Sequence, residues 1–236
     1  MDPILQVRNL TKHLGPLLVL KDMSFEVYPG EVLGLAGWGG AGKSVLASIL
    51  AGIQVPEEGE MYFDGKRIKW PFNSRKLGFE VIHQEPRIVE GLDICANLFL
   101  ANELAFPQWQ DNRLINPQKK MDLIAQSILT NLDVSLPSLH DNITTLSIEY
   151  RQLVAIARAM IKPSRLILVD DTAALLGFHY QQRLLSLIQT WQQEGKAIIF
   201  SSNNLDHIFS VTDRIAVLRE GSLVGTYKTD EVNREI

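Results

Sequence analysis

The chain has 236 residues, of which 46% are apolar and 21% are charged. This composition is typical of a globular protein and excludes the disordered, collagenous and low-complexity classes. Lysine and arginine number 23 against 27 acidic residues, so the net charge of −4 argues against sequence-independent nucleic-acid binding, and we expect no nucleic-acid partner.

Alternating apolar residues predict short strands of an antiparallel sheet in the first part of the chain. The pattern occurs in Ile4–Leu10, in Met23–Tyr28 and in Met61–Ile68. Turn-forming pairs, Pro29-Gly30 and Asp64-Gly65, punctuate these segments. We therefore expect an antiparallel β subdomain near the N-terminus.

A second kind of strand is apolar on both faces, as in a parallel sheet that helices cover on both sides. Val32–Ala36, Leu166–Asp170 and Ala197–Phe200 have this pattern and are bounded by chain breakers. From about Leu92 to Met160 the apolar period becomes helical, without a strand candidate, as in the spacing of Met121, Ile124, Ile128 and Leu132. The pattern predicts an α/β core with an inserted helical subdomain.

A glycine-rich loop stands between the buried strand at 32–36 and a helical run at 45–51. It satisfies the phosphate-loop pattern G-x-x-x-x-G-K-S through Gly37, Trp38, Gly39, Gly40, Ala41, Gly42, Lys43 and Ser44. Its backbone N–H groups and the helix N-terminus would bind phosphate, Lys43 would reach the β and γ phosphates, and Ser44 would ligate Mg²⁺. The alternative interpretation is a glycine-rich turn with a capping serine.

An acidic residue at the end of a neighbouring strand is the second part of such a site. Asp170 closes the strand Leu166–Asp170 and would hold hydrated Mg²⁺. An aspartate at a strand end is otherwise a turn former or a helix cap. Together with the loop, it predicts a site for Mg²⁺ and the phosphates of a nucleotide.

Further segments resemble the nucleotide-binding subunit of an ABC transporter, and within that superfamily the ATPases of ribose, galactose and xylose importers. These segments are Val81–Glu85 around the Q-loop, Ala96–Glu103, Leu146–Ile148 with Gln152–Arg158, and Leu205-Asp206 with Asp213–Leu218. The resemblance covers nearly the whole chain. The short motifs are common to all ABC proteins, whereas the Ile-His-Gln-Glu and Asn-x-Phe-Leu stretches point to the sugar class.

The resemblance implies one ABC ATP-binding domain over residues 1–236, with a P-loop NTPase (RecA-like) core. Its parts would be 1–90 (antiparallel β subdomain and phosphate loop), 91–160 (helical subdomain with the signature) and 161–236 (the rest of the core). Gln84 would complete the Mg²⁺ shell and sense the γ phosphate, although a solvated glutamine leaving a strand is the alternative. Such cassettes work as head-to-tail dimers in which each ATP lies between one phosphate loop and the other chain's signature.

Two positions depart from the family pattern where water should be activated. The catalytic glutamate is replaced by Asp171, whose carboxylate is one methylene shorter, and the switch histidine by Asn203. A displacement of about 1 Å in a positioned group can cost ~10²-fold in rate, so we expect weak alignment of the attacking water. His207 is interpreted as a surface residue of the next helix. The family's next residues read Pro-Thr-Ser-Ala-Leu, but here they are Thr172–Leu176, and the following position, which contacts the partner cassette, is Gly177.

The signature motif is also altered. It reads Leu146, Ser147, Ile148, Glu149 and Tyr150, and it would act on the partner's ATP. Ile148 is shared with the sugar class, but Glu149 replaces a glycine and would add negative charge near a phosphate. We expect Glu149 to oppose nucleotide binding if its carboxylate points at the partner's ATP.

The base-binding position lacks its usual aromatic residue. Leu14 occupies it, flanked by His13, so adenine stacking should be weakened unless the His13 ring turns inward. Trp38 inside the phosphate loop is unusual. We expect it to pack on the partner rather than shield the phosphates.

These features predict a degenerate ATP-binding subunit of an ABC importer for a sugar-like solute, with weak or absent hydrolysis. Its expected partners are a second, more active cassette in a heterodimer, two membrane permease subunits, and an extracytoplasmic solute-binding protein through the permease. The alternative is a regulatory, non-hydrolysing ATP-binding module of a membrane complex. A non-transport ABC protein is disfavoured because it would carry a long coiled coil or a second cassette.

Localisation follows from what the chain lacks. Cys95 is its one cysteine, which excludes an internal disulfide and favours a reducing compartment. The longest uncharged run, Ser44 to Pro56, is shorter than the ~20 apolar residues of a membrane span, and Met1-Asp2-Pro3 lacks the basic start of a signal peptide. We expect a peripheral protein on the cytoplasmic face of the membrane, held there by permease subunits.

Overall fold

The computed structural model describes residues 2–100 and 117–232. The chain forms two compact units, which we call the core unit (1–84, 164–174 and 181–236) and the helical unit (85–163 and 175–180). Residues 175–180 belong to the helical unit, although the segments on either side of them belong to the core unit. The subdomain assignment itself stays a prediction, and the resemblance at residues 101–103 lies outside the described residues.

The first sheet of the core unit is antiparallel, as the alternating patterns predict. It contains β1 (Leu5–Leu14), β2 (Leu17–Val27), β4 (Glu58–Phe63) and β5 (Lys66–Ile68), in the order β2-β1-β4-β5. The segment Met61–Ile68 is not one strand but part of a hairpin. Its turn residues Asp64 and Gly65 have positive φ angles of 52° and 72°, which reverse the chain between β4 and β5.

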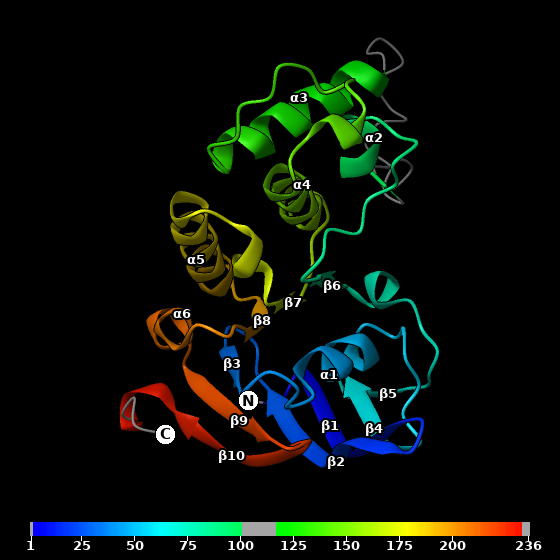
Figure 1. Ribbon diagram of the computed structural model, residues 1–236, viewed down its shortest axis with the longest axis vertical. Helices are drawn as coiled ribbons and strands as arrows, with labels where there is room; N and C mark the ends of the chain where they lie inside the picture. The colour runs from blue at the N-terminus through cyan, green and yellow to red at the C-terminus, as the bar shows by residue number, and fades with distance from the viewer. Residues whose placement is uncertain (1, 101–116, 233–236) are drawn as a thin grey trace. The chain divides into compact units, whose positions relative to one another are not determined.

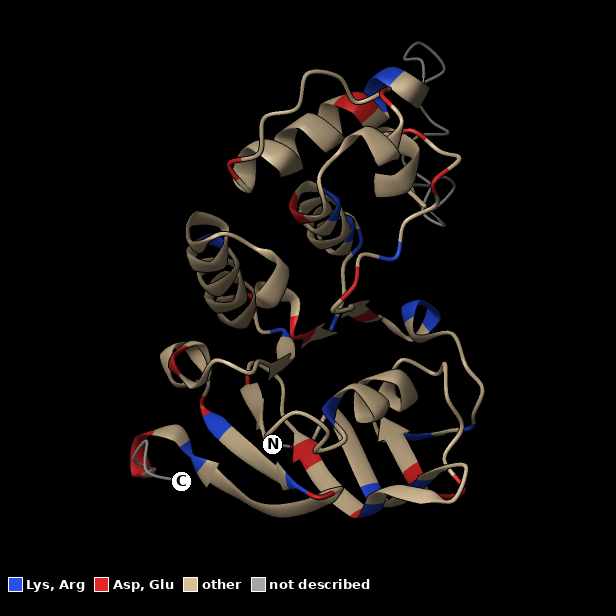
Figure 2. Ribbon diagram, viewed as in Figure 1, with Lys and Arg blue, Asp and Glu red and all other residues tan. Residues whose placement is uncertain are grey.

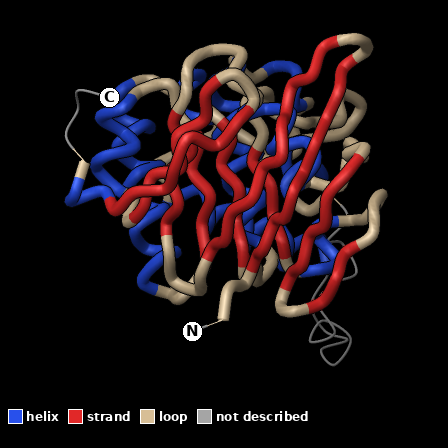
Figure 3. Tube along the Cα trace, turned by 90° about the horizontal axis from the view of Figure 1, so that it is seen from below, coloured by secondary structure: helices blue, strands red, loops and turns tan. Residues whose placement is uncertain are grey.

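The second sheet has the strand order β10-β9-β3-β8-β7-β6 (Figure 1). Figure 3 shows the strands in red. The strands are β3 (Val32–Ala36), β6 (Phe79–Ile82), β7 (Leu166–Asp170), β8 (Ala197–Ser201), β9 (Arg214–Arg219) and β10 (Ser222–Lys228). Neighbouring strands of this sheet pair in parallel, except β9 and β10, which form an antiparallel hairpin. Every residue of β3, β7 and β8 is buried, which explains why these strands are apolar on both faces.

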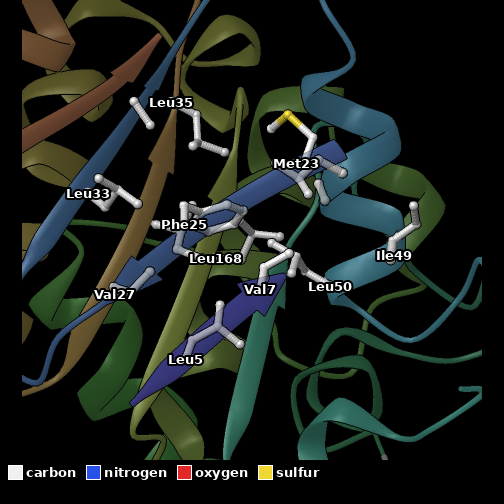
Figure 4. Packing of buried hydrophobic residues seen from close by; sticks show 14 of the residues in the cluster. Leu5, Val7, Met23, Phe25, Val27, Leu33, Leu35, Ile49, Leu50 and Leu168 are labelled. Atoms are coloured by element: carbon white, nitrogen blue, oxygen red, sulfur yellow. The ribbon is translucent and has the colours of Figure 1, made fainter. Parts of the chain in front are cut away.

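The core lies between the two sheets and α1 (Lys43–Leu50). Figure 4 shows Leu5 and Val7 of β1, Phe25 of β2 and Leu168 of β7 gathered in one apolar cluster, with Leu50 of α1 beside it. The sheets are also linked at one corner, where the Lys21 N–H donates to the Gly221 carbonyl at 2.8 Å. This packing holds α1, and therefore the loop before it, on the end of β3.

The remaining helices of the core unit are short apart from α5 (Phe178–Gln193), whose residues from 181 onward belong to this unit. They are α6 (Leu205–Val211) and 3₁₀ turns at Ser74–Leu77, Thr172–Leu175 and Thr229–Glu231. Over residues 2–100 and 117–232, no helix has the length and apolar character that a membrane crossing requires.

The helical unit contains α2 (Ile94–Leu98), α3 (Pro117–Asn131), a 3₁₀ turn (Ile143–Thr145) and α4 (Ile148–Ile161). Residues 92–100 and 117–160 contain no strand, as predicted; a single bridge pairs Asp93 with Asn142. Of the four residues with the predicted helical spacing, Met121, Ile124 and Ile128 lie on α3 and are half-buried, and Leu132 is buried one residue beyond its end; the buried residues of α3 are Ala125 and Leu129. The buried guanidinium of Arg158 on α4 donates to the carbonyl of Asn97 at 2.8 Å, which joins α4 to α2.

Candidate functional site

The candidate site lies at the carboxyl ends of three adjacent parallel strands in the core unit. The glycine-rich loop follows β3, Ser201 ends the neighbouring β8, and Asp170 ends β7. Asp170 pairs in register with Ser201, which in turn pairs with Leu35. The sheet therefore brings the loop and Asp170 to one edge, where open α/β sheets bind their ligands.

Backbone geometry prepares the loop to bind an anion. Gly42, the residue before α1, has φ 102°, and a Cβ there would lie 2.6 Å from Leu20 Cδ2. Gly40 also has a positive φ of 81°. The first turn of α1 contains no acidic residue, and no side chain caps it. The N–H groups at this helix end are thus oriented to receive a phosphate.

Lys43 is the cation of the site. Its ammonium donates to the carbonyls of Gly37 and Trp38 in its own loop, and the side chain is buried. Burial lowers the pKa of Lys43, and the charges of Asp171 and Asp170 oppose that shift. The site therefore places one ammonium beside two carboxyl groups. The ammonium can bind phosphate oxygens, and the carboxyl groups can bind the magnesium of a magnesium-bound polyphosphate.

Asp170 has the properties of a magnesium ligand. Burial raises the pKa of Asp170, and the hydroxyls of Ser201 and Ser44 counteract it. Within the described part of the chain, its Oδ1 atom is buried and accepts no hydrogen bond. A bound cation would satisfy that oxygen, while the exposed Ser44 contributes a hydroxyl. Among the described residues, no group of three or more His, Cys, Asp or Glu is placed to hold a metal ion.

Asp171 and Asn203 contact each other directly. The Asn203 side-chain amide donates to Asp171 Oδ2 at 2.5 Å, and its backbone N–H donates to Asp171 Oδ1 at 3.3 Å. Asp171 is buried and has a positive φ of 41°, a conformation that aspartate adopts more readily than glutamate. Both substitutions relative to the family pattern thus form one local structure, a relation that the separate motifs could not reveal.

The expected base-binding residues lie at the end of β1. Leu14 is 46% exposed, and the backbone N–H of His13 donates to Glu57 Oε2 at 2.7 Å. The His13 ring Nδ1 lies 3.6 Å from the same oxygen. The side chain of Lys12 also binds Glu57 and, with the His13 N–H, lowers the pKa of Glu57 to about 2. His13 is therefore engaged by an anion on its own chain.

The interpretation of His207 as a surface residue is wrong. It lies on α6 as expected, but its side chain is buried, and its Nε2 contacts the Asn204 side chain at 3.3 Å. Because α6 packs on β3, the face with His207 and Ile208 turns inward. A seven-residue helix gives too short a period for sequence alone to place that face.

The signature residues open α4 in the helical unit. The Ser147 hydroxyl accepts a 3.4 Å hydrogen bond from the Tyr150 N–H and so caps the helix. Leu146 is half-buried and Ile148 is exposed. Glu149 accepts a 2.6 Å hydrogen bond from the backbone N–H of Gly177. The carboxylate is therefore engaged within its own chain, and its expected effect on the partner's ATP stays a prediction.

Comparison with known proteins agrees with this geometry. The family model described as "ABC transporter" matches residues 20–174. The chain belongs to the ABC transporter family. This ABC cassette is 35% identical over 233 residues to the ribose import ATP-binding protein RbsA 2 of Escherichia coli O157:H7, a match that covers 98% of the chain and 45% of that protein. It is 32% identical over 237 residues to the xylose/arabinose import ATP-binding protein XylG of Sulfolobus acidocaldarius, a match that covers 100% of the chain and 92% of that relative.

Solved structures share the fold of the cassette. CbiO1 from Clostridium perfringens, part of the ABC transporter complex cbiONQ, has a TM-score of 0.75 at 22% identity, covering 100% of this chain and 92% of that one. The ATP-binding cassette MJ0796 bound to ADP and Pi has a TM-score of 0.79 at 22% identity, covering 95% and 98%. The predicted P-loop NTPase fold is confirmed. The chain spans about half the length of the ribose import relatives that it matches.

Within the core unit of this ABC cassette, the structure brings together the phosphate loop, Asp170, Asp171 and Asn203. Gln84 is exposed two residues beyond β6, and Trp38 is 90% exposed. The signature residues belong to the helical unit. The roles of all these residues in binding and catalysis stay predictions.

Proposed function

We propose that this chain is the ATP-binding subunit of an ABC importer for a sugar or sugar-like solute, and that it binds Mg·ATP with little or no hydrolysis of its own. Family membership supports ATP binding, and the printed names of the ribose and xylose/arabinose relatives support import of a sugar. One observation carries the proposal: an intact phosphate loop adjoins a buried Asp170, while Asp171 is bound by Asn203.

Binding uses the elements at the edge of the sheet. The N–H groups of the loop and of α1 donate to the phosphate oxygens, and Lys43 transfers its ammonium from loop carbonyls to the β and γ phosphates. Ser44 and Asp170 would hold the metal, and Gln84 would complete its shell. Bound Mg²⁺ supplies neutralisation of the phosphate charge. These interactions position ATP without requiring that it be cleaved.

Hydrolysis needs a carboxylate that aligns water with the γ phosphate. In this chain the Asp171 carboxylate is one methylene shorter than the family's glutamate and accepts two hydrogen bonds from Asn203. Asn203 cannot carry a proton as the family's histidine can. We infer slow or absent turnover at the chain's own ATP.

Coupling to transport would come through partners. We propose a heterodimer in which a more active cassette supplies the catalytic glutamate and Ser147 of this chain faces that partner's ATP. Two permease subunits would hold the pair at the cytoplasmic face of the membrane, with the solute-binding protein on the other side. A homodimer would contain two altered catalytic positions, which disfavours it.

The Asp171–Asn203 contact also favours a second candidate, a regulatory ATP-binding module that gates a membrane complex without cycling. The two candidates differ in the assembled complex. The importer subunit would show solute-stimulated ATPase activity there, and the regulatory module would show none.

Equilibrium binding tests the proposal on the purified full chain. Titration with Mg·ATP is expected to show saturable binding, and phosphate release should stay at background over the same period. Lys43→Ala is expected to weaken ATP binding by at least about 30-fold, because it removes the point charge of the loop. Lys76→Ala, which lies outside the site, is the matched control. Unchanged affinity in Lys43→Ala, or rapid turnover by the wild-type chain, would contradict the proposal.

A further inference from the structure

Two departures from the family pattern, a glutamate in the signature and a glycine at position 177, meet in the helical unit. Glu149 lies in the first turn of α4, and Gly177 directly precedes α5. The Glu149 carboxylate accepts the 2.6 Å hydrogen bond from the Gly177 N–H. The two residues lie 28 positions apart in the sequence.

The bond supplies something that α5 lacks. No residue in the first turn of α5 is acidic, and Figure 2 shows the ribbon of this helix almost entirely uncharged. A helix N-terminus carries N–H groups without partners and a partial positive charge. In a capping box, an acidic side chain at the third position of a helix accepts a hydrogen bond from the backbone N–H of the residue that precedes the helix. Tyr180 occupies the third position of α5, so this acceptor is missing there. Glu149 supplies the missing acceptor from another helix.

Space at position 177 is limited by the same carboxylate. A Cβ built on Gly177 would lie 3.1 Å from Glu149 Oε1, tighter than most contacts of a real Cβ atom. A longer side chain at 177 would therefore displace the carboxylate or be displaced by it. The glutamate at 149 and the glycine at 177 therefore fit together. A larger residue at 177 would be costly while Glu149 is present, so the effects of substitutions at the two positions should not add independently.

Neighbouring contacts reinforce the junction. The ring of Tyr150 packs edge-on against Tyr180 with centroids 6.2 Å apart, and the hydrogen bond with Tyr150 raises the pKa of Tyr180 to about 12. His179 Nε2 lies 2.9 Å from Asp133 Oδ2, just after α3. Residues 177–180 thus contact both α4 and the end of α3 inside one compact unit.

We propose that Glu149 is a positioning residue that fastens the signature to residues 175–180, so that the two segments move as one body. The inference rests on the proposed function, because there the signature acts on the partner's ATP and position 177 faces the partner cassette. Through the bond, a partner contact at position 177 sets the placement of Ser147. Glu149 itself does not face the nucleotide.

Hydrogen exchange on the full chain tests the bond without assuming any function. Glu149→Gln keeps the shape but removes the charge, and it is expected to speed exchange of the Gly177 amide by about five- to tenfold. Glu58→Gln, an exposed glutamate of β4, is the matched control. Equal exchange at Gly177 in wild type and Glu149→Gln would overturn the proposal.

A double-mutant cycle tests the mutual dependence of the two positions. Gly177→Ala is expected to lower the melting temperature of the wild-type chain, but to lower it less in a Glu149→Ala background, where the carboxylate is absent. Equal losses in both backgrounds would overturn the proposal. All members of the cycle are compared by their melting temperatures, so the test does not depend on activity.

Kinetics of the assembled complex separate positioning from charge repulsion. Loss of positioning in Glu149→Ala, which removes the acceptor, is expected to lower kcat several-fold and leave KM for ATP nearly unchanged. A lower KM with unchanged or higher kcat would show that the carboxylate repels nucleotide and would overturn the inference. Failure of the proposed function would appear separately, as loss of ATP binding by the wild-type chain or as its insensitivity to Lys43→Ala.

Discussion

Restoring both family residues, Asp171→Glu with Asn203→His, is expected to raise hydrolysis at this chain's own site. The carboxylate now sits about one methylene short of the family's glutamate, and a displacement of about 1 Å can cost ~10²-fold in rate. Asn203 occupies both carboxylate oxygens at 2.5 and 3.3 Å, so lengthening the side chain alone leaves it bound.

The single variants should give less than the double variant. Asp171 is buried with φ 41°, and glutamate tolerates this backbone conformation less well than aspartate, at a cost of about 1 kcal/mol. Asn203→His alone frees a carboxylate that is still too short. We therefore expect a gain of about 10- to 100-fold for the double variant and much smaller gains for each single one.

The assay must isolate one site. Phosphate release is measured in the assembled complex with the partner cassette's own hydrolysis disabled, and ATP affinity is measured in parallel. A full gain from Asp171→Glu alone would refute the argument that Asn203 restrains the carboxylate. No gain from the double variant, with ATP binding intact, would refute the assignment of these two residues as limiting.

Three further predictions concern the surrounding groups. Burial raises the pKa of Asp170, so ionising this carboxyl lowers the free energy of unfolding once the pH exceeds the unfolded pKa. Asp170→Asn should therefore raise the melting temperature at pH 7 but weaken Mg²⁺-dependent ATP binding by about tenfold. A lower melting temperature for this variant would contradict the argument. Leu14→Tyr, at a 46% exposed position, should tighten ATP binding by about tenfold through adenine stacking, and titration showing no tightening would count against the base-site assignment. A hydrogen bond with Asp93, together with the charge of Asp122, raises the pKa of His140 in the folded protein. The protonated ring therefore stabilises the fold fully below the unfolded pKa of ~6.5, and this stabilisation is lost as the pH rises through the folded pKa. His140→Gln should therefore flatten the pH dependence of thermal unfolding above pH ~6, and an unchanged profile would exclude the interaction.

The fold was largely predictable because its strands carry strong patterns. Leu166–Asp170 and Val32–Ala36 are buried on both faces, and the structure gives those same bounds. The hairpin at Asp64-Gly65 was signalled by its turn residues, yet its second strand has three residues, too few for a period to register. The burial of His207 depends on how α6 packs on β3, which is a tertiary property.

For the candidate site, the sequence identified residue types but not their contacts. The phosphate loop and Asp170 were found because one motif has fixed spacing and the sheet brings strand ends together. The contacts of Asn203 with Asp171 and of Glu149 with Gly177 join residues that are distant in sequence. Each pair consists of two departures from a family pattern, so paired departures are the signal that could have suggested them.

The central claim is that this chain binds ATP while hydrolysis occurs at its partner's site, to which it contributes the signature. Transport-coupled ATPase activity of the full complex tests it most directly, with Ser147→Arg compared against Asp171→Ala. Ser147 would donate to a charged γ phosphate, an interaction worth about 1.5–3 kcal/mol, so Ser147→Arg is expected to lower activity by at least about tenfold. Asp171→Ala is expected to change the ATPase activity less than about twofold, because that carboxylate contributes little to aligning the attacking water. A severe loss in Asp171→Ala beside a mild one in Ser147→Arg would contradict the claim and show that this chain's own site turns over.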